Sequence, residues 1–184
     1  MPNKLTVTLD EVSQSIDLSQ YLGREPTESE KENFAIEAID RIENRTLDGL
    51  DKNGRKFTKY SKEYAKKKGV SISAVDLFDE GKLLDSLNRF SDKESGSSVV
   101  IGIDDDLETK IAYNHQVGDT LPRRSFFGLS DSEAEAIALI IQEEDLVSNK
   151  EAELLAKALA VKATPKATSN LLKALSLLDL EQIE

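Results

Sequence analysis

Apolar and polar side chains alternate in two short segments of the chain, which is the period of a β-strand. Leu5 to Leu9 alternates in this way, and Ser15 to Leu18 predicts its hairpin partner. A short helix from Val12 is the alternative for that second segment. The segment from Val99 to Ile103, rich in β-branched residues, predicts a third strand.

Helical periodicity dominates elsewhere, and three helix starts are marked by residues spaced as a capping box. These pairs are Thr27 with Glu30, Ser130 with Glu133, and Ser148 with Glu151. The first predicted helix ends near Arg45, and its apolar face consists of Ala35, Ala38, Ile39 and Ile42. The second continues through Ile137 and Ile141 to about Asp145. The third ends before Pro165, and the leucines from Leu171 to Leu178 complete a helical hairpin.

Two further helices are predicted in the middle of the chain. Apolar residues recur at helical spacing through a basic stretch that ends at Gly69: Phe57, Tyr60, Tyr64 and Ala65. Leu77 to Phe90 predicts another helix. Asp104, Asp105 and Asp106 form a solvated turn in this interpretation, because the surrounding loop lacks the glycine and distal glutamate of a calcium loop.

The order of strands and helices predicts an α+β fold, a small antiparallel sheet with several packed helices. We expect one α+β domain over residues 1–147, whose first 25 residues form an arm or a hairpin. Residues 148–184 form a C-terminal helical extension.

The distribution of charge changes this picture more than the composition does. The chain carries a net charge of −11, yet residues Lys52 to Lys68 contain eight basic residues against one acid. A positive stretch on a negative body favours contacts with copies of the chain or with another acidic protein. Incidental contact with passing DNA is a weaker possibility than protein contact. The chain has no cysteine, which excludes disulfides and thiolate metal sites.

The chain contains a single histidine, His115, and it lies in an irregular segment from Ile111 to Leu129. A hydrolytic site would need a nucleophile with its orienting groups, and a metal site would need further ligands at fitting spacing. Neither is evident, so we expect no catalytic residue, no metal and no cofactor. We interpret His115 as a hydrogen-bonding residue at a structural turn, with Gly118 and Pro122 shaping the backbone.

The same segment carries two arginines and two phenylalanines after Pro122. An extended segment would point Phe126 and Phe127 to opposite sides, one into the core and one outward to a partner. Arg123 and Arg124 are expected to project from this stiffened segment toward another subunit, although pairing with an acid inside the domain is the alternative. The predicted partner-binding residues are Arg123, Arg124, Phe126, Phe127, Lys59, Lys66 and Lys67.

Three stretches of the chain resemble the phage virion-morphogenesis family, the Mu-type tail-completion proteins. They are Leu50 to Phe57 with Tyr60-Ser61 and Tyr64 to Gly69; Leu77 to Leu83 with Ser86-Leu87; and His115-Gln116-x-Gly118 with Leu121 to Arg124, Phe126 and Gly128 to Ser130. The likeness spans roughly residues 30–145. The N-terminal residues and the segment from Ser148 depart from the family pattern.

The resemblance implies a structural protein of a tailed phage rather than an enzyme. It implies head–tail joining (neck) or tail completion by a ring of copies, a hexamer or a dodecamer, around the DNA conduit. Its partners would be itself and neighbouring neck, connector, tube or sheath proteins, with DNA only in transit and no membrane. Its location would be the virion, after assembly in the host cytoplasm. A small regulatory module whose basic helix contacts an acidic protein or nucleic acid is the alternative.

Overall fold

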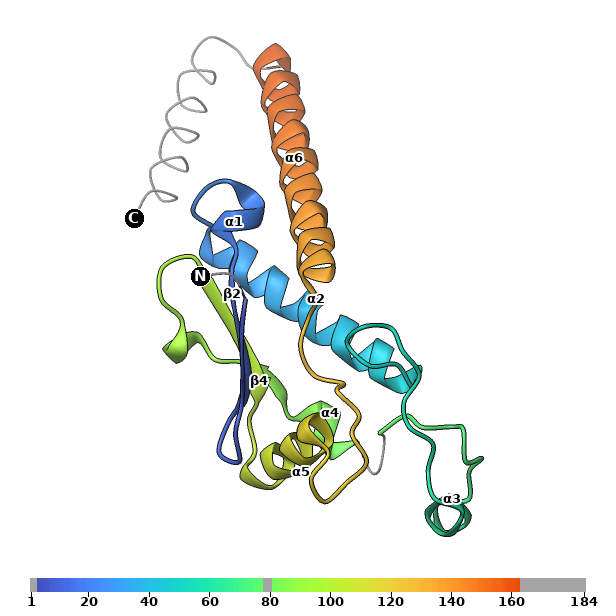
Figure 1. Ribbon diagram of the computed structural model, residues 1–184. Helices are drawn as coiled ribbons and strands as arrows, with labels where there is room; N and C mark the ends of the chain where they lie inside the picture. The colour runs from blue at the N-terminus through green and yellow to red at the C-terminus, as the bar shows by residue number, and fades with distance from the viewer. Residues whose placement is uncertain (1–2, 78–80, 163–184) are drawn as a thin grey trace. The chain divides into compact units, whose positions relative to one another are not determined.

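The computed structural model describes residues 3–77 and 81–162, and it separates the chain into two compact units, Met1–Ile141 and Gln142–Glu184 (Figure 1). The first unit contains a sheet and the helices that pack on it. The second contains the later part of a long helix. The architecture is α+β, as the order of predicted elements indicated.

The sheet is antiparallel throughout, with the strand order β1-β2-β4-β3. Strands β1 (Lys4–Val7) and β2 (Val12–Asp17) form a hairpin in which Val7 faces Val12. The predicted hairpin is therefore confirmed, and the alternative helix from Val12 is wrong. Strand β4 (Ser98–Ile103) is also confirmed, and its pairing with β2 and β3 places it in the sheet interior.

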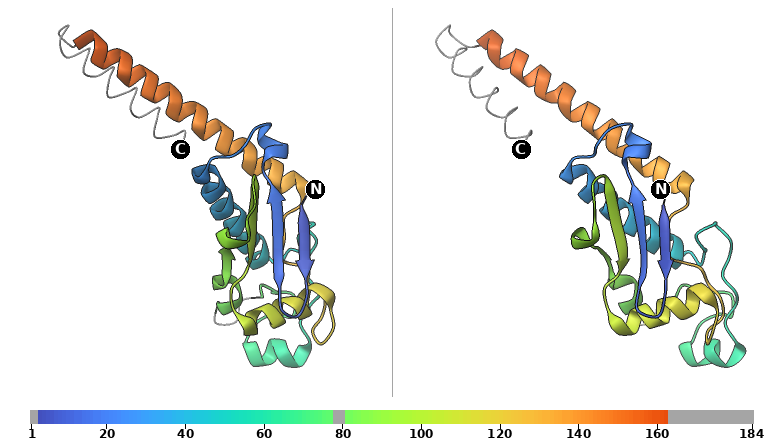
Figure 2. Two further views of the ribbon diagram at one scale, coloured as in Figure 1. Left: turned by 90° about the vertical axis from the view of Figure 1, so that its left-hand side faces the viewer. Right: turned by 60° about the vertical axis from the view of Figure 1, so that its left-hand side comes forward.

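Helix α2 (Glu28–Leu47) lies against one face of the sheet, after the short helix α1 (Ser19–Leu22) (Figure 2). Its predicted capping box is present. The Thr27 hydroxyl accepts from the Glu30 N–H at 3.2 Å, and the Glu30 carboxylate accepts from the Thr27 N–H at 2.7 Å. Phe34, Ala38 and Ile42 are fully buried on its inner face. The start of this helix was predictable because the capping box depends only on two residues that are three positions apart.

The helix predicted from Phe57 to Gly69 is much shorter in the structure. Helix α3 spans only Lys62–Lys68, and Ser61 caps it by accepting from the Tyr64 N–H at 3.1 Å. Before it, the Phe57 N–H donates to Gly49 O at 2.8 Å and the Tyr60 N–H donates to Ile72 O at 2.9 Å. These hydrogen bonds to distant carbonyls replace the bonds of a helix. Phe57 and Tyr60 are therefore buried in an irregular segment, and their helical spacing in the sequence does not reflect a helix.

The helix predicted from Leu77 to Phe90 is wrong over most of its length. The structure contains helix α4 (Lys82–Asp85), then strand β3 (Leu87–Arg89) and the 3₁₀ turn η1 (Ser91–Lys93). Leu87 pairs with Ile103 of β4. Pairing at the sheet edge therefore outweighed the local helical pattern of the leucines.

Helix α5 (Asp106–Val117) takes the place of the first part of the irregular segment that was expected from Ile111 to Leu129. The Asp105 carboxylate caps it by accepting from the N–H groups of Leu107 and Glu108 at 2.8 and 3.0 Å. The aspartate run is thus a helix start, and His115 lies in the last helical turn instead of at an irregular turn. Gly118 ends the helix with a φ of 79°, which confirms the unusual backbone angle predicted for it.

Helix α6 (Asp131–Lys162) begins at the predicted capping box, where the Ser130 N–H donates to the Glu133 carboxylate at 2.8 Å. The helix passes through residues 148–151 without a break, so the third predicted helix start is wrong. The second arm of the expected C-terminal hairpin, Leu171 to Leu178, lies outside the described residues. Across residues 3–77 and 81–162, the structure contains no helix with the length and apolarity needed to span a membrane.

Candidate functional site

The segment from Ser125 to Leu129 is held inside the first unit by hydrogen bonds that its backbone carbonyl groups accept. Each of its five backbone carbonyls accepts a hydrogen bond from a residue distant in sequence. The donors are Lys52 N to Ser125 O at 2.9 Å, Arg45 Nη2 to Phe126 O at 2.7 Å and to Gly128 O at 2.8 Å, Gln116 Nε2 to Phe127 O at 2.9 Å, and Gln14 Nε2 to Leu129 O at 3.1 Å. We call this segment the strap.

The strap buries both of its phenylalanines. Phe126 and Phe127 have no exposed surface, and their rings lie edge to face with centroids 6.4 Å apart. The prediction that one of them faces outward is therefore wrong. An extended segment covered by the protein on both sides buries alternate side chains equally, so alternation alone does not predict an exposed face.

The two adjacent arginines have different environments. Arg123 is exposed, and its Nε donates to Gln116 O at 3.2 Å. Arg124 retains only 4% of its surface, and its Nε donates to Thr58 O at 3.0 Å. The expectation that both arginines project outward is therefore wrong for Arg124. The Arg124 N–H donates to His115 O at 2.7 Å, which ties this residue to the end of α5.

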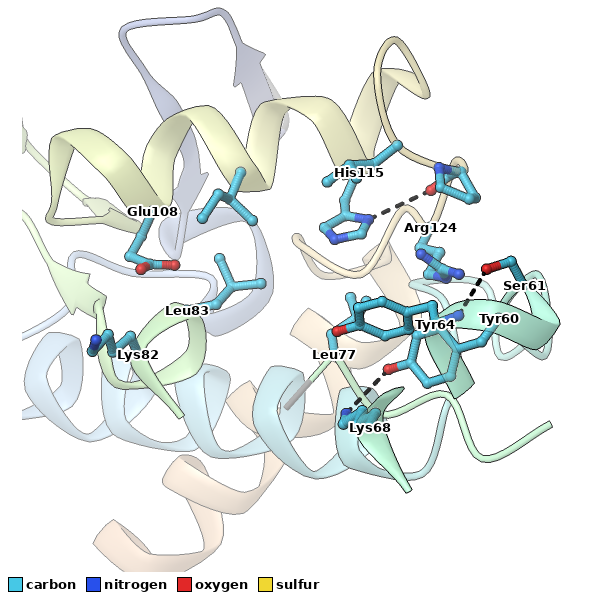
Figure 3. A pocket seen from close by; sticks show the side chains of 13 residues that line it. Tyr60, Ser61, Tyr64, Lys68, Leu77, Lys82, Leu83, Glu108, His115 and Arg124 are labelled. Carbon is cyan, nitrogen blue, oxygen red and sulfur yellow. Dashed lines mark hydrogen bonds between the residues drawn. The ribbon is translucent and has the colours of Figure 1, made fainter. Parts of the chain in front are cut away.

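Arg124 lines a cavity of about 680 Å³ that we call the α5 cavity (Figure 3). Its walls come from the α3 region, from α4 and α5, and from the segment that leads into the strap. Most of the lining is apolar or aromatic and consists of Tyr60, Tyr64, Leu77, Leu83, Ile111, Leu121 and Pro122. A cavity of this size with a few polar groups has the dimensions of a small-molecule site.

The end of the α5 cavity near Arg124 is built around the ring of Tyr60. The Arg124 guanidinium carbon and the Lys68 ammonium nitrogen each lie 5.2 Å from the centroid of this ring. The ring of Tyr64 lies 4.9 Å away, tilted by 54°. Attraction between a cation and an aromatic face holds the guanidinium at a defined position.

Neither Lys68 nor His115 supplies an uncompensated positive charge. Lys68 is paired with an acid, and His115 is uncharged at neutral pH. The Lys68 ammonium donates to the Asp76 carboxylate at 2.7 Å, and the Tyr60 hydroxyl donates to the same oxygen at 3.2 Å. His115 has Nδ1 3.4 Å from Pro122 O, which suits a proton on Nδ1. Burial, together with the nearby charge of Arg124, lowers the pKa of His115 to about 4.

Glu108 and Lys82 line the opposite end of the cavity (Figure 3). Glu108 lies on α5 seven residues before His115, so about two helical turns, or roughly 10 Å, separate the two ends. Burial and the nearby Asp105 raise the pKa of the Glu108 carboxyl, while Lys82 opposes this shift. The cavity is therefore electrically asymmetric along its length.

The other predicted partner-binding residues lie outside the α5 cavity. Lys59, Lys66 and Lys67 are exposed and do not line it. Sequence reasoning missed Tyr60 and Glu108 as lining residues, because nothing local links them to Arg124. It also missed Arg45 as a buried residue. The available signal was its position on the inner face of the first long helix.

No cluster of three histidine, aspartate or glutamate side chains suited to a metal ion exists among the described residues. Comparison with known proteins found no similar family model, no similar curated protein and no similar solved structure.

Proposed function

We propose that the chain is a structural protein of a tailed bacteriophage that acts in head–tail joining or tail completion. It works by assembling with copies of itself into a ring around the DNA conduit and by contacting the neighbouring neck, connector, tube or sheath proteins. The resemblance of three sequence stretches motivates the phage assignment. The separation of exposed charge in the structure is the observation that supports self-assembly.

Positive charge is exposed along one continuous part of the first unit. Six of the eight basic residues between Lys52 and Lys68 are exposed: Arg55, Lys56, Lys59, Lys62, Lys66 and Lys67. Arg123 adds to this group, because it lines a second hollow of about 420 Å³ together with Arg55 and Lys56. We call these seven residues the basic surface.

Negative charge is exposed on other elements. On α2 it comes from Asp40 and from Glu28 and Glu32, which share the single positive charge of Arg89, and at the start of α6 from Asp131 and Glu135. Placing opposite charges on different elements makes a surface that is complementary to a second copy of itself. The charges then select the partner and the register of the contact, while each exposed pair contributes only about 0–1 kcal/mol.

Apolar residues near the acidic positions supply the anchors that exposed charge pairs lack. Leu139 and Ile140 on α6 are 55% and 38% exposed, and Ile36 on α2 is 56% exposed. These replace Phe126 and Phe127 as the proposed apolar part of the interface. The proposed partner-binding residues are therefore Arg123, Lys59, Lys66 and Lys67 with these three, and Arg124 serves inside the subunit.

Sedimentation velocity at low and high salt tests the assembly. We expect multimers of ring size at about 50 mM salt that dissociate at about 500 mM, because salt screens exposed charge pairs. The double variant Lys59→Glu with Lys66→Glu should remain folded and lose the multimer. A matched control, Lys110→Glu with Lys150→Glu, makes the same change in net charge outside the basic surface and should still assemble.

A purely monomeric wild type at low salt, also in the presence of extract containing phage necks and tails, contradicts the proposal. So does equal loss of assembly in the two double variants. Retention on DNA that weakens steeply with salt, without self-association, would instead support the regulatory binding module.

A further inference from the structure

Arg124 is a buried cation without an acidic partner in the described part of the chain. Its Nε donates to Thr58 O, and its guanidinium lies over Tyr60. No hydrogen bond or ion pair of its two terminal nitrogens occurs among the described residues. Neither nitrogen is sealed off, because the described polar atoms that are fully buried without a partner belong to Asn3, Arg45 and Gln116. The terminal nitrogens of Arg124 are therefore accessible, and the residue lines both the α5 cavity and the neighbouring hollow that contains Arg55 and Lys56.

This arrangement is energetically unfavourable for the protein alone. A charged group that is 96% covered loses most of its hydration, and here no carboxylate compensates for that loss. Burial accordingly lowers the pKa of the Arg124 guanidinium, and the nearby Tyr60 and Tyr64 oppose this shift. An anion placed against the two terminal nitrogens would restore the missing interaction.

The shape of the site favours one class of anion. One guanidinium edge matches the two oxygens of a carboxylate, and its position is fixed in advance by Thr58 and Tyr60. Lys68 is neutralised by Asp76 and His115 is uncharged at neutral pH, so this end offers a single positive charge. A dianion such as phosphate would have only one of its two negative charges compensated by Arg124. Beyond Arg124, the walls formed by Leu83 and Ile111 suit an apolar body.

We propose that the α5 cavity is a binding site for a carboxylate carried on an apolar body. The carboxylate pairs with the terminal nitrogens of Arg124, and the apolar body lies between the tyrosine rings and the α4–α5 walls. This inference does not depend on the proposed assembly function. The carboxylate belongs either to a free small acid or to an acidic side chain of another polypeptide, and the experiment below separates these sources.

Tyrosine fluorescence reports binding directly, because the chain has no tryptophan and two of its four tyrosines line the cavity. Titration with hexanoate should change this signal and raise the melting temperature of the full chain. Hexanamide, which has the same shape without the charge, should bind about tenfold more weakly because it lacks the charged hydrogen bonds. Inorganic phosphate should not compete with hexanoate.

Arg124→Met keeps the volume of the side chain and removes the charge, so hexanoate should bind about tenfold more weakly or not at all. The matched control is Arg123→Met, which makes the same charge change next door but does not line the cavity. It should leave hexanoate affinity within about twofold. Circular dichroism of both variants checks that they are folded. If Arg124→Met does not fold, the preference of the wild type for hexanoate over hexanamide decides the question.

A second titration uses a capped peptide, acetyl-Leu-Glu-Leu-amide, against its glutamine counterpart. Arg124-dependent binding of hexanoate assigns a free acid, and Arg124-dependent binding of the glutamate peptide alone assigns an acidic side chain. The inference is overturned if neither probe binds, if the charged and neutral members of each pair bind equally, or if Arg123→Met weakens binding as much as Arg124→Met. None of these outcomes bears on assembly, which the sedimentation experiment measures separately.

Discussion

Two buried arginines in the same unit have opposite electrostatic surroundings. Arg45 on α2 pairs with Glu133 at 2.5 Å and donates to two carbonyls of the strap. Arg124, 4% exposed against 9% for Arg45, donates to one carbonyl and contacts no acid in the described structure. A third arginine, Arg89, is also enclosed by carboxylates, those of Glu28, Glu32 and Glu94.

The difference separates a structural arginine from a binding arginine. Where this chain buries a guanidinium for stability, it supplies the compensating acids itself. At Arg124 the chain instead supplies an aromatic platform, a cavity and an uncompensated charge. Perturbed and unpaired ionisable groups in a cavity are typical of functional sites.

Arg45→Met should destabilise the protein by about 3–5 kcal/mol, because it leaves Oε1 of Glu133 without its ion-pair partner and two strap carbonyls without their donor. Urea unfolding followed by circular dichroism measures the change. Arg41→Met, one helical turn earlier on α2, is the matched control and should cost less than about 1 kcal/mol. Equal stability of the two variants would show that Arg45 does not hold the strap.

Acidification should remove stability through His115. Its pKa is about 4 in the folded chain against 6.5 as the ordinary value, so the unfolded chain takes up the proton first. The neutral His115 therefore makes its full contribution to the free energy of unfolding above about pH 6.5. That contribution is lost as the pH falls toward 4, by at most roughly 3 kcal/mol. Unfolding free energies of wild type and His115→Gln should converge over this range.

Other groups also make the free energy of unfolding depend on pH, notably Glu94 and Glu133, whose pKa values are lowered in the folded chain. They remain in both proteins, so the difference between the two pH profiles isolates the histidine. Profiles that run parallel from pH 7 to pH 4 would contradict a buried neutral His115.

Arg124→Met should change the free energy of unfolding by less than about 1 kcal/mol, since no acid loses its partner and an apolar side chain tolerates the site. The same change should raise the pKa of His115, because the Arg124 charge is one of the causes that lower it. NMR titration of the His115 ring measures that shift. A stability loss as large as that of Arg45→Met would contradict the distinction between the two arginines.

The parts of the fold that sequence predicted are those set by short-range hydrogen bonds. Thr27 with Glu30 and Ser130 with Glu133 mark helix starts because the partners are three residues apart. The alternating hairpin of β1 and β2 was predictable for the same reason. Leu87 to Arg89 was missed, because its conformation depends on pairing with Ile101 to Ile103.

The candidate site was less predictable than the fold. Its charged end combines Tyr60, Lys68 and Arg124, which are brought together only by tertiary structure. Sequence reasoning singled out the tandem arginines as functional candidates, but it gave both the same outward direction. The two differ through contacts such as the bond from the Arg124 N–H to His115 O, and no pattern of neighbouring residues predicts that bond.

The strap also has a consequence for how the chain acquires its fold. Its carbonyls are bonded by donors at positions 14, 45, 52 and 116, so contacts up to 115 residues apart must close together. Non-local contacts of this kind slow folding, because distant segments must meet before the contacts between them can stabilise the fold. On the ribosome, the hairpin and α2 emerge long before their bonding partners do. We therefore expect the first unit to become protease-resistant only after residues 125–141 have been released.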